Sequence, residues 1–72
     1  MANVLAQMVA SVIAVPAAVG DRVGAGETLL IVESMKMEIP VLAPVAGVVE
    51  RLEVNLGDVV EEGDLLAVVT PG

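Results

Sequence analysis

The only lysine of this 72-residue chain, Lys36, lies in the segment ESMKME at 33–38. If a strand over 28–34 pairs with a strand over 37–43, Met35 and Lys36 become the two central residues of a hairpin turn. Asn-Gly and other glycine-containing pairs suit such a turn, because its central residues need positive φ. Two bulky residues there break a local rule, which points to function: the turn would present the lysine amine at its tip, away from the core.

The chain contains an internal duplication. Displacing the sequence by 37 positions aligns residues 4–33 with residues 41–70, and ten of the thirty pairs are identical. The glycines and aspartates recur at turn positions, in VGDRVGAGETL at 19–29 and in LGDVVEEGDLL at 56–66. Two copies are too few for a solenoid, so we expect the halves to pack about a pseudo-twofold axis in a single domain over residues 1–72.

Residue types predict an all-β fold. Hydrophobic residues make up 57% of the chain, and 16 residues are valine, a β-branched type that suits pleated sheet. The runs 29–32 and 65–69 are continuously apolar between turn residues, which indicates buried strands. Pro40 and Pro44 bracket a short segment that can only be an edge strand or the end of a strand.

Apolar and polar residues alternate from Arg51 to Leu56, a pattern typical of a strand with one solvated face. The aligned segment of the first copy should form the same strand. We therefore expect these side chains to face inward: Leu52, Val54 and Leu56, with Val15, Ala17 and Val19 at the equivalent positions.

Composition argues against several functions. The chain has no cysteine and no histidine, so it lacks disulfides, thiolate metal sites and the usual zinc, copper or catalytic-triad chemistry. It also has no aromatic residue to stack on bases, and its net charge of −7 disfavours nucleic acid. We interpret the acidic residues as solvated turns, not as a calcium loop or a general acid–base pair: Asp58, Glu61, Glu62 and Asp64, and Glu33 with Glu38.

The first 20 residues carry no charged side chain, so a membrane-spanning or secretory segment has to be weighed. No basic residue precedes this stretch, polar residues and Pro16 interrupt it, and it aligns with a charged segment of the second copy. We therefore expect no membrane association, no export and a cytoplasmic location. Met1 directly before the first strand and Gly72 just after the last favour a complete small protein.

An isolated Met-Lys-Met would ordinarily be a solvated lysine between methionines that fold back onto the sheet. Here it coincides with the only lysine, the centre of the duplication and matching Gly-Asp turns on both sides. With ESMKMEIPVLAPVAGVV at 33–49, the chain resembles the biotinyl (biotin carboxyl carrier) domains of biotin-dependent carboxylases, and in particular the short stand-alone biotin/lipoyl attachment proteins. The resemblance covers essentially all 72 residues.

This resemblance implies a flattened barrel-sandwich hybrid of two four-stranded antiparallel sheets with pseudo-twofold symmetry. By the same resemblance, Lys36 would carry biotin in amide linkage. Met35 and Met37, with Glu33 and Ser34 as further hairpin residues, would be read by the biotin protein ligase and the carboxylase. The chain would then be a non-catalytic biotin carboxyl carrier protein, which shuttles a carboxyl group between a biotin carboxylase and the carboxyltransferase of an acyl-CoA carboxylase.

The chain departs from the family pattern in two places. Gln7 and Ala10 stand where the second copy has Pro44 and Gly47, which would loosen the first strand. Nothing is inserted between the first Gly-Asp turn and Gly26, so the protruding thumb of some carrier domains should be absent.

Two other functions stay open. Lipoyl domains share the duplicated fold, so lipoate, alone or together with biotin, is an alternative attached group. Lipoyl hairpins usually present an acidic residue before the lysine and a small one after it, whereas both neighbours of Lys36 are methionine. The other alternative is an unmodified structural or interaction module that adds a strand at an exposed sheet edge.

Overall fold

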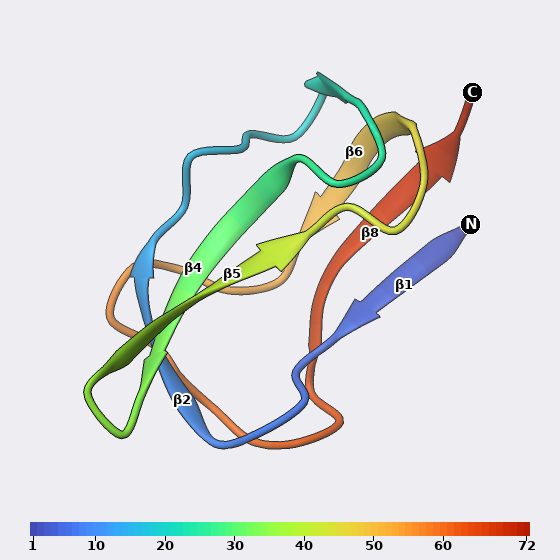
Figure 1. The fold of residues 1–72 in the computed structure, drawn as a ribbon. Helices are drawn as coiled ribbons and strands as arrows, with labels where there is room; N and C mark the ends of the chain where they lie inside the picture. The colour runs from blue at the N-terminus through green and yellow to red at the C-terminus, as the bar shows by residue number, and fades with distance from the viewer.

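The computed structural model describes all 72 residues and contains eight strands in two four-stranded antiparallel sheets (Figure 1). The first sheet has the strand order β1-β8-β6-β3, and the second has the order β5-β4-β2-β7. The predicted fold class is therefore confirmed. The strands are β1 (Ala2–Leu5), β2 (Ala10–Ala14), β3 (Arg22–Val23), β4 (Thr28–Ser34), β5 (Met37–Leu42), β6 (Gly47–Leu52), β7 (Val59–Val60) and β8 (Leu65–Pro71).

The two sheets are related by the internal repeat. The four strands β1 to β4 correspond in order to β5 to β8, and exchanging each strand for its counterpart converts the order of the first sheet into that of the second. Each sheet therefore takes strands from both halves of the chain. Because β4 pairs with β5 and β1 pairs with β8, neither half can complete a sheet without the other.

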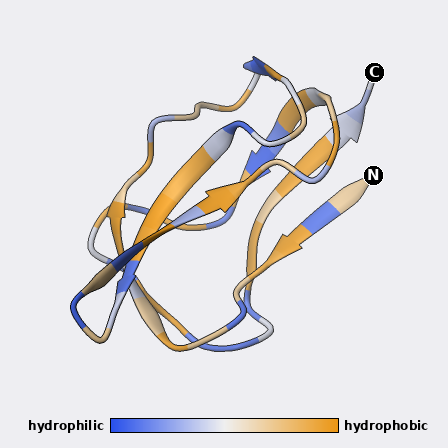
Figure 2. Cartoon of the chain, in the orientation of Figure 1, coloured by the Kyte–Doolittle hydropathy of each residue, from blue (hydrophilic) through white to orange (hydrophobic).

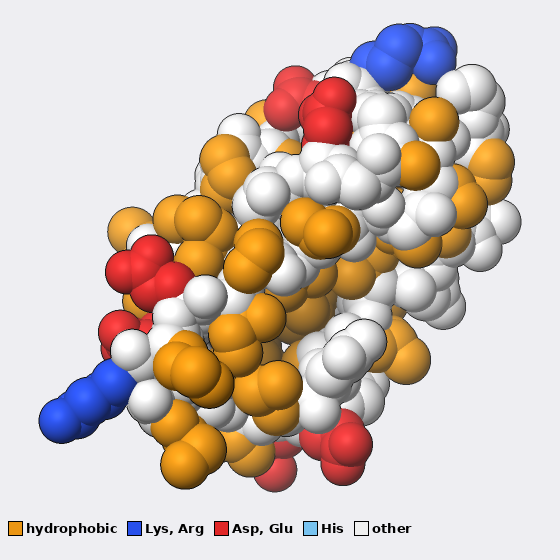
Figure 3. Space-filling model, viewed as in Figure 1, with side chains coloured by type: hydrophobic (Ala, Val, Ile, Leu, Met, Phe, Trp, Pro, Cys, Tyr) orange, Lys and Arg blue, Asp and Glu red, His pale blue; other side chains and the backbone are white.

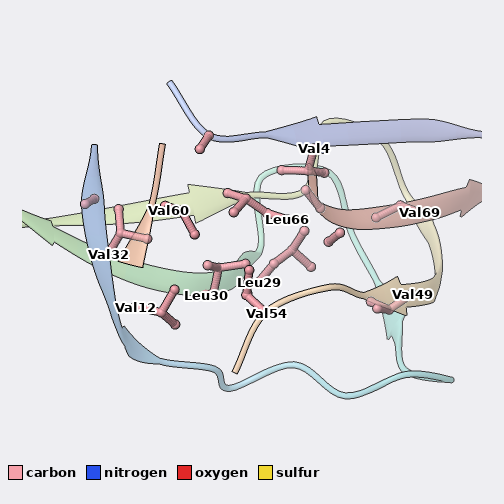
Figure 4. Packing of buried hydrophobic residues seen from close by; sticks show 14 of the residues in the cluster. Val4, Val12, Leu29, Leu30, Val32, Val49, Val54, Val60, Leu66 and Val69 are labelled. Atoms are coloured by element: carbon pink, nitrogen blue, oxygen red, sulfur yellow. The ribbon is translucent and has the colours of Figure 1, made fainter. Parts of the chain in front are cut away.

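Aliphatic side chains from both sheets point toward one another and form a single core (Figure 4). The runs 29–32 and 65–69 supply the middle strands β4 and β8, as predicted, and no polar or charged side chain is buried. Hydrophilic residues gather in the turns and at the tip of the β4–β5 hairpin (Figure 2). The largest fully buried side chains are Leu29, Leu30, Leu66, Val12, Val49 and Val69.

The duplicated Gly-Asp turns have the geometry that their residue types predict. The glycines at these turns adopt φ values near +90°, which only glycine reaches without strain. The carboxylates of Asp21, Asp58 and Asp64 each accept a hydrogen bond of 2.8–2.9 Å from the backbone N–H three residues earlier. These bonds close the turns locally, so the loops need no core contacts of their own.

The expectation for the alternating segments is wrong at their ends. Val54 is buried and Leu52 is half-buried, but Leu56 is 68% exposed, and the equivalent Val19 is 62% exposed. The cause is that β6 ends at Leu52, so the last residues before the turn lie outside the ladder. Alternation of side chains between two faces holds only while the backbone stays extended.

The two copies also differ where Ala10 replaces glycine. At its counterpart Gly47, a Cβ atom would clash with the carbonyl oxygen of Thr70 in the neighbouring strand, so only glycine allows the approach. Gly47 pairs with Pro71, whereas the β2–β4 ladder begins one residue later, at Ser11 with Glu33. The β2–β4 ladder therefore begins one residue pair later than the β6–β8 ladder.

The remaining connections are short. Residues 24–27 alone join β3 to β4, so no thumb-like segment projects there, as expected from the sequence. No helix of the structure is long and apolar enough to cross a membrane.

The contrast between Leu66 and Leu56 tests the core. Leu66 is 1% exposed, so Leu66→Ala should lower the free energy of unfolding by about 2–5 kcal/mol through lost contacts and a residual cavity. Leu56→Ala removes the same atoms from an exposed position and should change it by about 0.5 kcal/mol or less. Urea denaturation followed by circular dichroism measures both, and equal losses would contradict the placement of Leu56 outside the core.

Candidate functional site

The β4–β5 hairpin carries every site residue that the sequence predicts. Ser34 pairs with Met37 at the end of the ladder, which leaves Met35 and Lys36 as a two-residue turn. Their φ values are 53° and 65°, and they are the only residues other than glycine with positive φ. Positive φ at both central residues is the signature of a type I′ turn. The predicted hairpin is therefore confirmed.

This turn is strained by its residue types. The left-handed conformation costs roughly 1–2 kcal/mol for a residue with a Cβ atom. Six residue pairs between β4 and β5 hold the turn closed, and β4 is also paired with β2 on its other side. The sheet thus fixes the position and direction of Lys36 in spite of the local cost, as is common where a backbone has a functional role.

The tip of the hairpin is exposed to solvent. Lys36 is exposed, and the flanking methionines Met35 and Met37 are 89% and 61% exposed. The single ion pair of the structure joins Arg51 to Glu53 at 2.7 Å, and no side-chain hydrogen bond involves Lys36. Figure 3 shows a cationic side chain projecting from the end of the molecule where β4 and β5 meet. The amine is therefore free of intramolecular partners.

Acidic side chains lie directly behind the tip. Glu33 in β4 is paired with Glu38 in β5, and both are exposed. Like charges on opposite strands repel each other, so this pair weakens the hairpin slightly and does not stabilise it. Ser34, one residue nearer the turn, is half-buried. Glu33 and Ser34 therefore lie at the end of β4, at the base of the turn.

The turn acids away from the hairpin serve the fold. Asp58 and Asp64 use their carboxylates to close their own turns, and Glu61 and Glu62 are exposed beside them. The structure brings no three acidic side chains into an arrangement that would hold a metal ion.

The geometry fits the covalent attachment of a prosthetic group. An amide link needs a primary amine that an enzyme can reach, and Lys36 offers one on a rigid support with no neighbour to displace. The attached group would extend from the exposed tip of the hairpin. The chemistry that this site provides is the presentation of one amine, within a β-sandwich built from two interlocked repeats.

The chain belongs to the biotin/lipoyl attachment family, whose model, described as "Biotin-requiring enzyme", matches residues 2–69. The "Biotinylated protein TB7.3 homolog" of Mycobacterium leprae is 53% identical over 68 residues, which cover 94% of this chain and 96% of the relative. These findings confirm the resemblance that the Met-Lys-Met hairpin and the duplication indicate.

Two solved structures have the same fold. A single-chain, multi-domain long-chain acyl-CoA carboxylase matches with a TM-score of 0.91 and 37% identity over 99% of this chain and 7% of that protein. The lipoyl domain of the 2-oxoglutarate dehydrogenase complex from Azotobacter vinelandii matches with a TM-score of 0.79 and 26% identity over 96% of this chain and 98% of that domain. The fold is thus shared by biotinyl and lipoyl domains.

The strain in the turn can be tested through the free energy of unfolding. Met35→Asn should raise the free energy of unfolding by about 1 kcal/mol, because asparagine tolerates the left-handed conformation. Met37 is also an exposed methionine but lies in β5, so Met37→Asn should lower it by a few tenths to about 1 kcal/mol. The midpoints of urea denaturation of the two variants, each compared with that of the original protein, test this prediction. A loss of stability in both variants would contradict the type I′ assignment.

Proposed function

We propose that this chain is a biotin carboxyl carrier and that Lys36 is its attachment residue. The observation that carries the proposal is the position of the only lysine: it is exposed, unpaired and held in a strained two-residue turn between two copies of a repeat. A solvated lysine without function has no need of this costly backbone. The similarity to a relative named as a biotinylated protein, along almost the whole of both chains, supports biotin as the attached group.

Biotin held on Lys36 would supply a ureido nitrogen as the acceptor of the carboxyl group. The chain itself acts as a non-catalytic carrier domain over residues 1–72. Its contribution is a rigid hairpin that places a long tether where a biotin carboxylase and then a carboxyltransferase can reach it. Tethering raises the effective concentration of the group at each site without any new contact. The partners we propose are a biotin protein ligase and the two active sites of an acyl-CoA carboxylase, in the cytoplasm.

The flanking methionines are suited to recognition. Met35 and Met37 expose flexible, polarisable thioethers on either side of the amine, and such side chains adapt to apolar surfaces of different shapes. We propose that the ligase and the carboxylase contact both of them. Glu33 and Ser34 contribute from the base of the hairpin, where the pairing of β4 with β5 fixes their position.

Lipoate, alone or alongside biotin, is the alternative that shares this fold. The similarity to a lipoyl domain supports it, although at 26% identity against 37% for the carboxylase. Methionine on both sides of Lys36 favours biotin.

Moving the lysine tests the attachment site. Lys36→Arg keeps the charge but removes the acylable amine, so incubation with biotin protein ligase, ATP and biotin should leave its intact mass unchanged and its streptavidin blot blank. The control adds Arg51→Lys to Lys36→Arg, which returns one lysine at a position whose side chain is 61% exposed. It should also stay unmodified. Biotinylation of the Lys36→Arg variant, or of the double variant at position 51, would refute Lys36 as the attachment residue.

Turn position can be tested apart from composition. Combining Met35→Lys with Lys36→Met exchanges the two residues and leaves charge and hydrophobicity unchanged. The amine then leaves the turn in another direction and loses a methionine on one side, so the rate of biotinylation should fall by at least about tenfold, while the circular dichroism spectrum stays that of folded β-structure. Equal rates for the exchanged and original proteins would mean that exposure alone suffices.

A further inference from the structure

An apolar groove lies between β1 and β5, the edge strands of the two sheets. Its volume is about 400 Å³, and its floor is the core itself, exposed here through Val4, Ala6, Ala10 and Leu66. Figure 3 shows hydrophobic atoms gathered around a hollow in this face of the molecule. The sequence gives no sign of this feature, because its two walls come from strands more than thirty residues apart.

The groove crosses the pseudo-twofold axis but is not symmetric about it. Its centre contains residues together with their counterparts, such as Val4 with Val41 and Leu5 with Leu42. Beyond the centre it continues in one direction only. Met8, Ala10 and Ile39 line it, whereas the residues at the equivalent positions, Val45, Gly47 and Ala2, do not. The groove therefore extends toward the end of the molecule that carries Lys36.

The asymmetry lies where the first copy has Ala10 and the second has Gly47. In the second copy, Gly47 lets β6 approach β8 closely. In the first copy, the β2–β4 ladder begins one residue later, and Ala10 instead becomes a small side chain on the groove floor. A cleft of this volume, mostly apolar and with a few polar groups, is typical of a site for a small ligand.

We propose that the biotin carried by Lys36 docks in this groove when no partner engages it. The inference rests on the proposed function. Ile39, at the near end of the groove, is three residues from Lys36, which corresponds to about 10 Å along β5. The lysine side chain followed by the pentanoyl chain of biotin is longer than this when extended. Lys36 is the only lysine, so the arm is the one acyl-lysine of the chain that can reach the opening.

The lining matches the chemistry of the ring system. The fused rings of biotin present carbon atoms and a thioether to the apolar floor, together with a ureido group that has two N–H donors and one carbonyl acceptor. Asn3 and Gln7 are among the lining residues, and the side-chain amide of each has both a donor and an acceptor. Both residues are exposed, so their amides remain free to pair with the ureido group.

A docked arm has a measurable consequence. For a partner that binds only the extended arm, the apparent affinity equals the intrinsic affinity multiplied by the fraction of arms that are extended. The groove thus provides a resting position that every partner must compete with.

The test uses the biotinylated protein, with modification verified by intact mass. In solution NMR, nuclear Overhauser contacts should join the biotin ring protons to the methyl groups of Met8 and Ile39. Met8→Glu puts a charge at the groove and should abolish these contacts. Val9→Glu is the matched control, because Val9 is an exposed apolar neighbour in the same loop that does not line the groove, and it should keep them.

Capture by streptavidin gives a second readout. Wild-type protein and Val9→Glu should be captured about three- to tenfold more slowly than Met8→Glu, because streptavidin needs the extended arm. Contacts confined to Lys36 and Met37, equal capture rates for the three proteins, or the same loss of contacts in both variants would overturn docking while leaving the carrier function intact. A chain that the ligase leaves unmodified would overturn the carrier function and docking together.

Discussion

The pairing of β4 with β5 is the constraint on which the rest of this structure depends. It joins the end of one repeat to the start of the next, and only Met35 and Lys36 are left to connect them. A two-residue connection between twisted antiparallel strands requires positive φ, so the chain accepts the left-handed conformation at two bulky residues. The direction of the lysine is therefore set by the way the two halves interlock, and not by contacts of its own side chain.

The two ends of the molecule differ where the two copies of the repeat differ. The repeat is symmetric in strand order, but glycine occurs at Gly47 and alanine at Ala10. The β2–β4 ladder begins one residue pair later than the β6–β8 ladder, and the apolar groove lies at the end that bears the hairpin.

Much of the fold follows from local patterns in the sequence. The strands, the edge position of β5, the glycine turns and the hairpin all depend on residues close together in the chain, where period, turn chemistry and proline placement are informative. Alternation of apolar and polar residues predicts that Leu56 and Val19 face inward, but both are exposed. The alternating pattern continues in the sequence beyond the point where the ladder of paired residues stops. The groove cannot be predicted from the sequence for a different reason. It forms between edge strands of two different sheets, and no short-range sequence pattern determines how far apart those strands lie.

The two arginines of the chain make intramolecular contacts, and the lysine makes none. Arg22 donates a hydrogen bond of 3.1 Å to the carbonyl oxygen of Gly72, and Arg51 pairs with Glu53, so positive charge needed near the surface is supplied by arginine. A guanidinium stays protonated and does not serve as an acyl acceptor as a lysine amine does. With Lys36 as the only side-chain amine, a modifying enzyme meets no competing lysine on this surface. The proposed modification would then be selective for two reasons: the turn exposes Lys36, and no other side chain of the protein is a primary amine.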